Sequence, residues 1–206
     1  NGKIASKTGE IKLVSADPNV RINLDGHADF TGKYAAAKIR LQMDSINFQA
    51  LKLYKSELRI HGTIKADFPE LNPDYPRGTF IWTEPIIVAD GKKYLPDSMF
   101  ISSRPSQDTG QNIVIFTDVM KGTITGHTPL TKIGAIIQDH INRHYAFRKK
   151  DSTGKVPALV NIVNKKDSNS AKVPANYDLK IAAHIEDKPL LHVVLPGITY
   201  IDTVAI

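Results

Sequence analysis

Apolar and polar residues alternate along most of this chain, the pattern of a half-buried β-strand. The clearest runs place apolar side chains at Val20, Ile22 and Leu24, at Ile39, Leu41 and Met43, and at Leu58, Ile60, Ile64 and Ala66. Successive side chains of a strand point to opposite faces, so each run has one apolar face and one polar face. The apolar face must be covered, either by the chain's own core or by an apolar ligand.

Glycine, proline, asparagine and aspartate residues separate these runs and mark the turns. The predicted strands span residues 11–14, 20–30, 35–46, 52–68, 79–89, 99–103, 112–125, 158–163, 177–185 and 190–195. Asp90-Gly91, between two apolar runs, is the clearest hairpin turn. All-β domains of this length are commonly single units, so we expect residues 1–206 to form one β-rich segment.

Three of the alternating runs contain an internal glycine, at Gly26, Gly62 and Gly122. Glycine inside a strand often marks a bulge or a tight bend, because it adopts backbone angles that other residues resist. The glycines therefore predict a sheet that curls, although each of them taken alone is as readily incidental.

One helix is predicted over residues 129–146. Thr128 suits the N-cap and Pro129 the first helical position. Leu130, Ile133, Ile137 and Ile141 recur at three- and four-residue spacing and form one apolar stripe. A helix with a single apolar stripe must lie on another element, so we expect it to cap the sheet.

Composition excludes several classes of protein. The chain has no cysteine, which rules out disulfides, thiolate metal sites and a cysteine nucleophile.

The net charge of +6 allows attraction to nucleic acid or anionic lipid, but a solvated basic surface is the simpler interpretation, and no nucleic-acid partner is predicted. The chain starts at Asn1 without a signal sequence and stops within an alternating run, so we expect a segment of a longer protein.

Two short motifs suggest chemistry, and neither is convincing. Asp108-Thr109-Gly110 matches the tripeptide of aspartic proteases, but it follows a polar loop and has no second copy to supply the partner carboxylate, so an ordinary turn is favoured. His140 and His144 are one helical turn apart, a spacing that could bind a metal, yet Arg143 beside them would repel a cation. The sequence therefore predicts a protein that is not an enzyme and has no metal or cofactor.

The order of features over residues 58–147 resembles that of a known family. A strand with an internal glycine is followed by a proline-rich stretch, then by a hairpin over residues 86–99, then by strands over 112–118 and 120–126, and finally by the helix. This order is similar to the large repeat-rich TamB and AsmA-like proteins of Gram-negative cell envelopes. The resemblance covers about half of the chain and rests on pattern rather than on one motif.

This resemblance implies a curved, largely antiparallel β-sheet that forms a trough, taco-like or sandwich structure with an apolar concave face. It implies transport of phospholipid across the periplasm between the inner and outer membranes, or outer-membrane protein assembly with a barrel partner. It also implies that the membrane anchor of such a protein lies outside this segment. The candidate lipid-facing residues are Ile22, Leu24, Ile39, Leu41, Met43, Leu58, Ile60 and Ile64.

Two other functions stay open at this point. The first is an extracellular β-sandwich that binds carbohydrate or protein through its loops, with Tyr75, Trp82 and Tyr94 as contact aromatics. The second is an enzyme that pairs Asp108 across a dimer. Two closely packed sheets would favour the sandwich, whereas an open apolar face would favour a lipid-binding segment.

Overall fold

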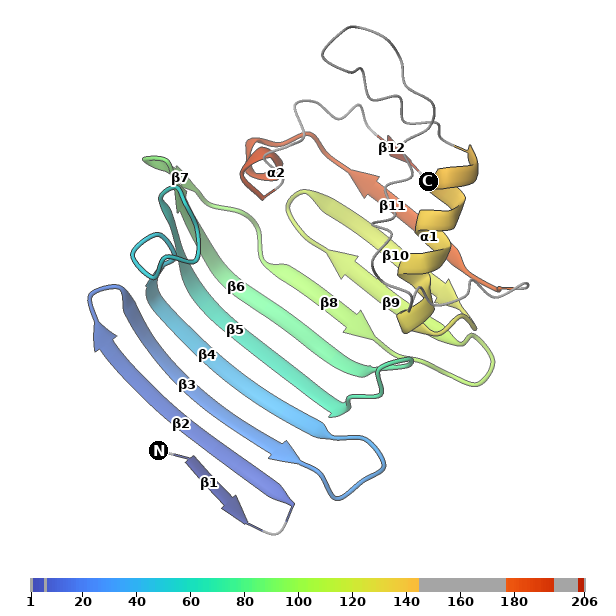
Figure 1. Ribbon diagram of the computed structural model, residues 1–206, viewed down its shortest axis with the longest axis horizontal. Helices are drawn as coiled ribbons and strands as arrows, with labels where there is room; N and C mark the ends of the chain where they lie inside the picture. The colour runs from blue at the N-terminus through green and yellow to red at the C-terminus, as the bar shows by residue number, and fades with distance from the viewer. Residues whose placement is uncertain (1, 6, 145–176, 195–203, 206) are drawn as a thin grey trace, which may run out of the picture.

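The computed structural model describes residues 2–5, 7–144, 177–194 and 204–205. These residues form one open antiparallel sheet of 12 strands and two helices (Figure 1). The strands are β1 (Gly2–Ala5), β2 (Thr8–Asp17), β3 (Val20–Asp29), β4 (Ala36–Asn47), β5 (Leu58–Glu70), β6 (Arg77–Ala89), β7 (Lys92–Tyr94), β8 (Met99–Ser103), β9 (Gln111–Phe116), β10 (Met120–Gly126), β11 (Lys180–Ile185) and β12 (Val204–Ala205). The helices are α1 (Leu130–His144) and α2 (Pro189–Val194).

The sheet is a meander in which each strand pairs with its neighbour in sequence, apart from the short β7. β7 pairs with the end of β6 through the predicted hairpin, where Asp90 and Gly91 both have positive φ. β8 then pairs with the earlier part of β6 and continues the sheet to β9, β10 and β11. The prediction of a mainly β, largely antiparallel sheet is therefore confirmed, as one sheet rather than two packed sheets in the described part of the chain. The trough stays a prediction.

The three strand glycines have different roles. Gly62 has φ of +123° and lies where the pairing of β5 with β6 shifts register. The extra residue of this bulge is on β6, where Glu84 has φ of +51°, so Gly62 lies opposite the bulge and not in it. Gly26 and Gly122 lie inside regularly paired stretches. At Gly26 an added Cβ would approach Ile11 Cγ2 to 2.8 Å, so this glycine makes room for a side chain of the neighbouring strand and does not bend the chain.

Helix α1 is fixed at its start by a loop from elsewhere in the sheet. Asp74, between β5 and β6, accepts a hydrogen bond from the Leu130 backbone N–H through its carbonyl oxygen and one from the Thr131 hydroxyl through its carboxylate. The predicted N-cap residue, Thr128, is buried and donates its hydroxyl hydrogen to the carbonyl of Asp178, before β11. The helix start is therefore held by two distant segments, a feature that local capping rules do not contain.

Two sequence predictions about the helices are wrong. In α1 the buried residues are Ile133 and Ile136, whereas Ile137 is 40% exposed. The buried side of the helix therefore contains Ile136 in place of the predicted Ile137. Ile141 lies among the α1 side chains that the structure does not describe. The strand predicted over residues 190–195 is instead the short helix α2, which buries Leu190 and Leu191. The strand predicted over 158–163 lies outside the described residues.

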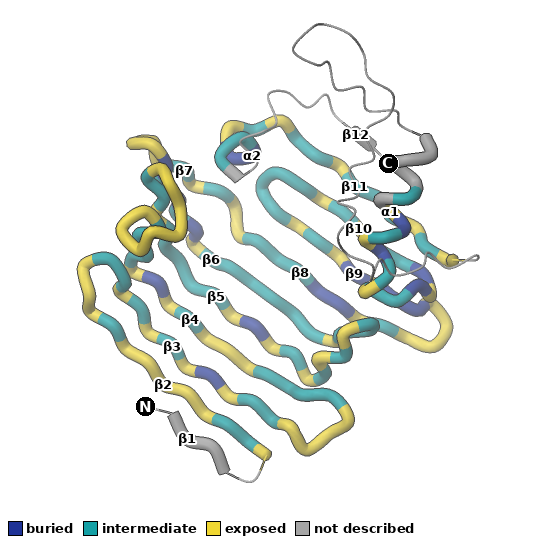
Figure 2. Tube along the Cα trace, viewed as in Figure 1, coloured by how far each residue is buried: buried dark blue, intermediate teal, exposed yellow. Residues whose placement is uncertain are grey.

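Strand β2 has no buried residue and β3 has only Gly26, whereas the buried apolar residues lie farther along the sheet and on the helices (Figure 2). The buried apolar residues are Met43, Ala66, Ile87, Ala89, Ile113, Ile133, Ile136, Leu190 and Leu191. Neither described helix overlaps β2, β3, β4 or β5 in Figure 1, although that view would show a helix on either side of the sheet. Within the described chain, these strands therefore form a single layer.

Candidate apolar binding face

Strand pairing places the apolar residues of neighbouring strands directly opposite one another. One row of successive partners runs from β2 to β8 and consists of Leu13, Leu24, Leu41, Ile64, Trp82 and Met99. Directly opposed residues share one face of a sheet and have their Cβ atoms about 5 Å apart. The row is therefore a continuous apolar band across the sheet.

A second row on the same face extends from β2 to β11. Its successive partners are Ile11, Gly26, Ile39, Ala66, Phe80, Ile101, Ile115, Gly122 and Ala183. Small residues alternate with large ones over the first part of this row, so the large side chains fit beside one another. The two rows together are called the apolar face below.

The apolar face is open at one edge. Ile11, Leu13 and Ile39 are 47%, 43% and 39% exposed, although all three are large aliphatic residues. Farther along the sheet Ile113 is buried at 7% exposure. A contiguous exposed apolar patch on a protein surface commonly marks an interaction site, whereas single exposed apolar residues do not.

All eight predicted lipid-facing residues lie on strands β3, β4 and β5. Leu24, Leu41 and Ile64 are successive partners in the first row, and Ile22 pairs with Met43 beside them. Ile39 belongs to the second row.

The other predicted residues lie toward one end of these strands. Ile60 pairs with Ile46 and Ile87, and Leu58 pairs with Ala89. Met43 is only 3% exposed, so it is the least accessible of the apolar strand residues named here.

Several members of the apolar face are not among the residues predicted from sequence to face lipid. These members are Ile11 and Leu13, which lie in a predicted strand, and Phe80, Trp82 and Ile101. The signal was present, because each lies in a run that alternates or is largely apolar. What the sequence did not contain was the register that aligns these residues with Leu24 and Leu41.

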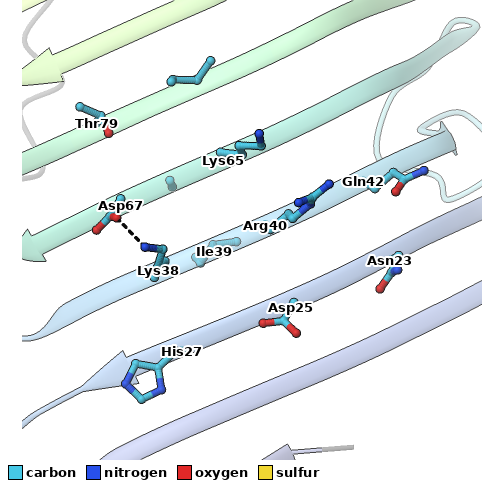
Figure 3. Close-up of a pocket in the computed structure, with 12 residues that line it drawn as sticks. Asn23, Asp25, His27, Lys38, Ile39, Arg40, Gln42, Lys65, Asp67 and Thr79 are labelled. Atoms are coloured by element: carbon cyan, nitrogen blue, oxygen red, sulfur yellow. Dashed lines mark ion pairs between the residues drawn. The ribbon is translucent and has the colours of Figure 1, made fainter.

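The opposite face of β2 to β5 is polar and charged. Its partners include Lys12, Asp25, Arg40 and Lys65 in one row and Glu10, His27, Lys38 and Asp67 in the next. A hollow of about 720 Å³ lies on this face, and Figure 3 shows its polar side chains. Lys38 and Asp67 form an ion pair across it at 3.0 Å. The sheet therefore separates an apolar surface from a charged one.

The aromatic residues of the alternative binding-module hypothesis do not meet in one place. Tyr75 precedes β6 and donates its hydroxyl hydrogen to the His127 carbonyl at 2.6 Å. Trp82 lies within β6 and donates its indole N–H to the His61 carbonyl at 3.1 Å. Tyr94 pairs with Ile87 near the other end of β6, so it is roughly 30 Å along the strand from Tyr75.

Of the two short motifs that suggested chemistry, the structure describes the one at Asp108, which forms a turn. Asp108 is in an exposed turn closed by reciprocal backbone hydrogen bonds between Ser106 and Gly110, at 2.9 and 3.0 Å. The side chains of His140 and His144 are outside the described part of the chain. The described residues contain no group of histidine and carboxylate side chains that could hold a metal ion.

Comparison with protein-family models, curated proteins and solved structures finds no match to this chain.

An ion pair links the start of α1 to the start of β11. His127 Nδ1 is 2.7 Å from a carboxylate oxygen of Asp178, and His127 Nε2 is 3.3 Å from the Gln107 carbonyl. The hydrogen bond to Asp178 raises the pKa of His127, and the same bond lowers the pKa of Asp178. The charged forms of both residues are therefore favoured in the folded protein.

This pair predicts a pH-dependent contribution to stability. The raised pKa of His127 stabilises the fold fully below the ordinary value of 6.5, and this effect is lost as pH rises through the folded-state value. The lowered pKa of Asp178 stabilises the fold above the ordinary value of 3.8, and this effect is lost as pH falls through the folded-state value. An Asp178→Asn variant should therefore melt below the wild-type protein at pH 5, and the difference should shrink as pH rises through the folded-state pKa of His127. An Asp108→Asn variant is the control, and an Asp178→Asn deficit that does not change with pH would contradict the prediction.

Proposed function

We propose that this chain is a non-enzymatic lipid-binding segment whose apolar face holds the acyl chains of phospholipid. The observation that supports the proposal is the unbroken apolar band from Leu13 to Met99, together with the exposure of Ile11, Leu13 and Ile39 at its open edge. A surface of this kind can bind an acyl chain without specific hydrogen bonds or ion pairs, because burying each methylene contributes about 0.8 kcal/mol to the binding free energy.

The dimensions of the band suit an acyl chain. Neighbouring strands are about 4.8 Å apart, so the steps from β2 through β6 to β8 span roughly 24 Å. One leaflet contributes about half of the roughly 30 Å hydrocarbon core of a bilayer. An extended acyl chain laid across the strands would therefore contact apolar side chains along its whole length.

The family resemblance extends the proposal to a cellular role. The order of features over residues 58–147 is similar to TamB and AsmA-like envelope proteins. On that basis the segment lies in the periplasm and takes part in phospholipid transport between the inner and outer membranes, or in outer-membrane protein assembly with a barrel partner. Among the described residues, no helix is long and apolar enough to cross a membrane.

Lipid extraction and direct titration test the proposal. The purified chain should retain phospholipid that organic extraction and mass spectrometry detect, and after delipidation it should bind a fatty acid with a fluorescent label. Binding should be saturable and should be competed by unlabelled fatty acid. Recovery of no lipid together with the absence of saturable acyl-chain binding would contradict the proposed function.

A further inference from the structure

The charged face has an unusual pair of like charges. Arg40 of β4 and Lys65 of β5 are direct cross-strand partners. Like charges directly opposite one another in a sheet are destabilising, because their Cβ atoms are about 5 Å apart. Both side chains are exposed and line the hollow of about 720 Å³ (Figure 3).

Asp25 is the direct cross-strand partner of Arg40 on its other side, but its carboxylate forms an ion pair with Lys12. The neighbouring lysines of this face form ion pairs, which Arg40 and Lys65 do not. Lys38 lies 3.0 Å from Asp67, and Lys12 lies 3.5 Å from Asp25. Within the described part of the chain, the ion pairs do not include Arg40 or Lys65. The two carboxylates of the hollow are thus paired with other lysines, and two adjacent positive charges are left for an external anion.

We propose that Arg40 and Lys65 form a binding site for a phosphate group. An arginine presents a planar fork of donors that matches phosphate, and a lysine adds a compact positive charge beside it. A phosphate offers several acceptor oxygens and relieves the repulsion between the two side chains. Asn23, Gln42 and Thr79 line the same hollow and supply neutral polar groups around the phosphate.

The size of the hollow indicates a phosphate carried on a larger molecule. Its volume of about 720 Å³ lies within the range of roughly 300–1,000 Å³ that is typical of small-molecule sites. The phosphate could come from a soluble phosphorylated compound or from a lipid head group. Because the site and the apolar face lie on opposite sides of the sheet, this proposal does not rest on the proposed acyl-chain binding.

Titration with defined probes tests the site. At fixed ionic strength, glycerol 3-phosphate or inorganic phosphate should raise the melting temperature and shift the backbone NMR signals of Arg40 and Lys65. Vesicles containing phosphatidylglycerol, compared with pure phosphatidylcholine vesicles, test the head-group source. An Arg40→Gln/Lys65→Gln variant should bind the responding probe at least about tenfold more weakly. Its melting temperature without probe should change little, because the substitutions remove the repulsion between the two cations together with the attraction of Arg40 to Asp25.

A Lys92→Gln/Lys93→Gln variant is the matched control. It removes the same number of charges from β7, away from the hollow, and should bind the probe as the wild-type protein does. A response to the soluble phosphates, or to phosphatidylglycerol vesicles alone, supports the site if the Arg40→Gln/Lys65→Gln variant loses it. Equal loss in both variants, an unchanged Arg40→Gln/Lys65→Gln variant, or no response to any probe would overturn the proposal. Acyl-chain binding by the same protein distinguishes this failure from failure of the proposed function.

Discussion

A Leu13→Asp/Ile39→Asp variant is expected to bind a labelled acyl chain at least about tenfold more weakly than the wild-type protein, a difference of about 1.4 kcal/mol. The two substitutions remove apolar contact from the open edge of the apolar face. They also place carboxylates where the acyl chain would lie, and an ionised carboxylate covered by hydrocarbon loses hydration that nothing replaces. Fluorescence titration of the delipidated protein measures the effect.

The fold should tolerate these substitutions because both positions face solvent in the free protein. Leu13 is 43% exposed and Ile39 is 39% exposed, so the new carboxylates stay hydrated until a ligand covers them. Circular dichroism and a thermal melt of each variant establish that the sheet is intact. Binding should therefore change much more than stability does.

A Val14→Asp/Gln42→Asp variant is the matched control for this experiment. It adds the same negative charge to the same two strands but on the opposite face, where both residues pair with Asn23. Val14 is 75% exposed, so its substitution buries no charge. Equal losses in the two variants would indicate a general effect of net charge, and unchanged binding in both would show that the apolar face is not the site.

The faces of the long strands could be predicted from sequence because the period of two is a local property. Leu24, Leu41 and Ile64 were assigned to one face from their own strands, and the pairing places them in one row. The extension of that row to Leu13 and Trp82 depends on register across strands and bulges. Local alternation does not encode register, which is why the pairing of Arg40 with Lys65 was also missed.

The helices show where local pattern is ambiguous. From Ile133, both Ile136 and Ile137 satisfy helical spacing, and only the position of the covering segment decides which of them is buried. The run that forms α2 is too short for periodicity to separate strand from helix. Pro189 at the first position of α2 is the sequence feature that favours a helix there.

Gly62→Ala is expected to destabilise the protein by about 2–3 kcal/mol, which lowers the ratio of folded to unfolded molecules by roughly 30- to 150-fold. Gly62 has φ of +123°, a conformation that residues with a Cβ resist. An added Cβ would also lie 2.4 Å from Trp82 Nε1 and 2.8 Å from the Thr83 carbonyl oxygen. The close approach of β6 at this register shift therefore leaves no room for even the smallest side chain at Gly62, and urea unfolding measures the cost.

Gly9→Ala is the control, because Gly9 is also in a strand but an added Cβ would meet nothing within 4 Å. It should leave the free energy of unfolding unchanged or slightly raised, since alanine restricts the unfolded chain more than glycine does. Trp82 is the only tryptophan, and its indole hydrogen bond to the His61 carbonyl lies beside Gly62. Folded Gly62→Ala should therefore show red-shifted emission, because the displaced indole becomes more exposed to water, whereas Gly9→Ala should not. Equal stability and emission in the two variants would contradict the close approach of β6 to Gly62 and the register of the apolar face that depends on it.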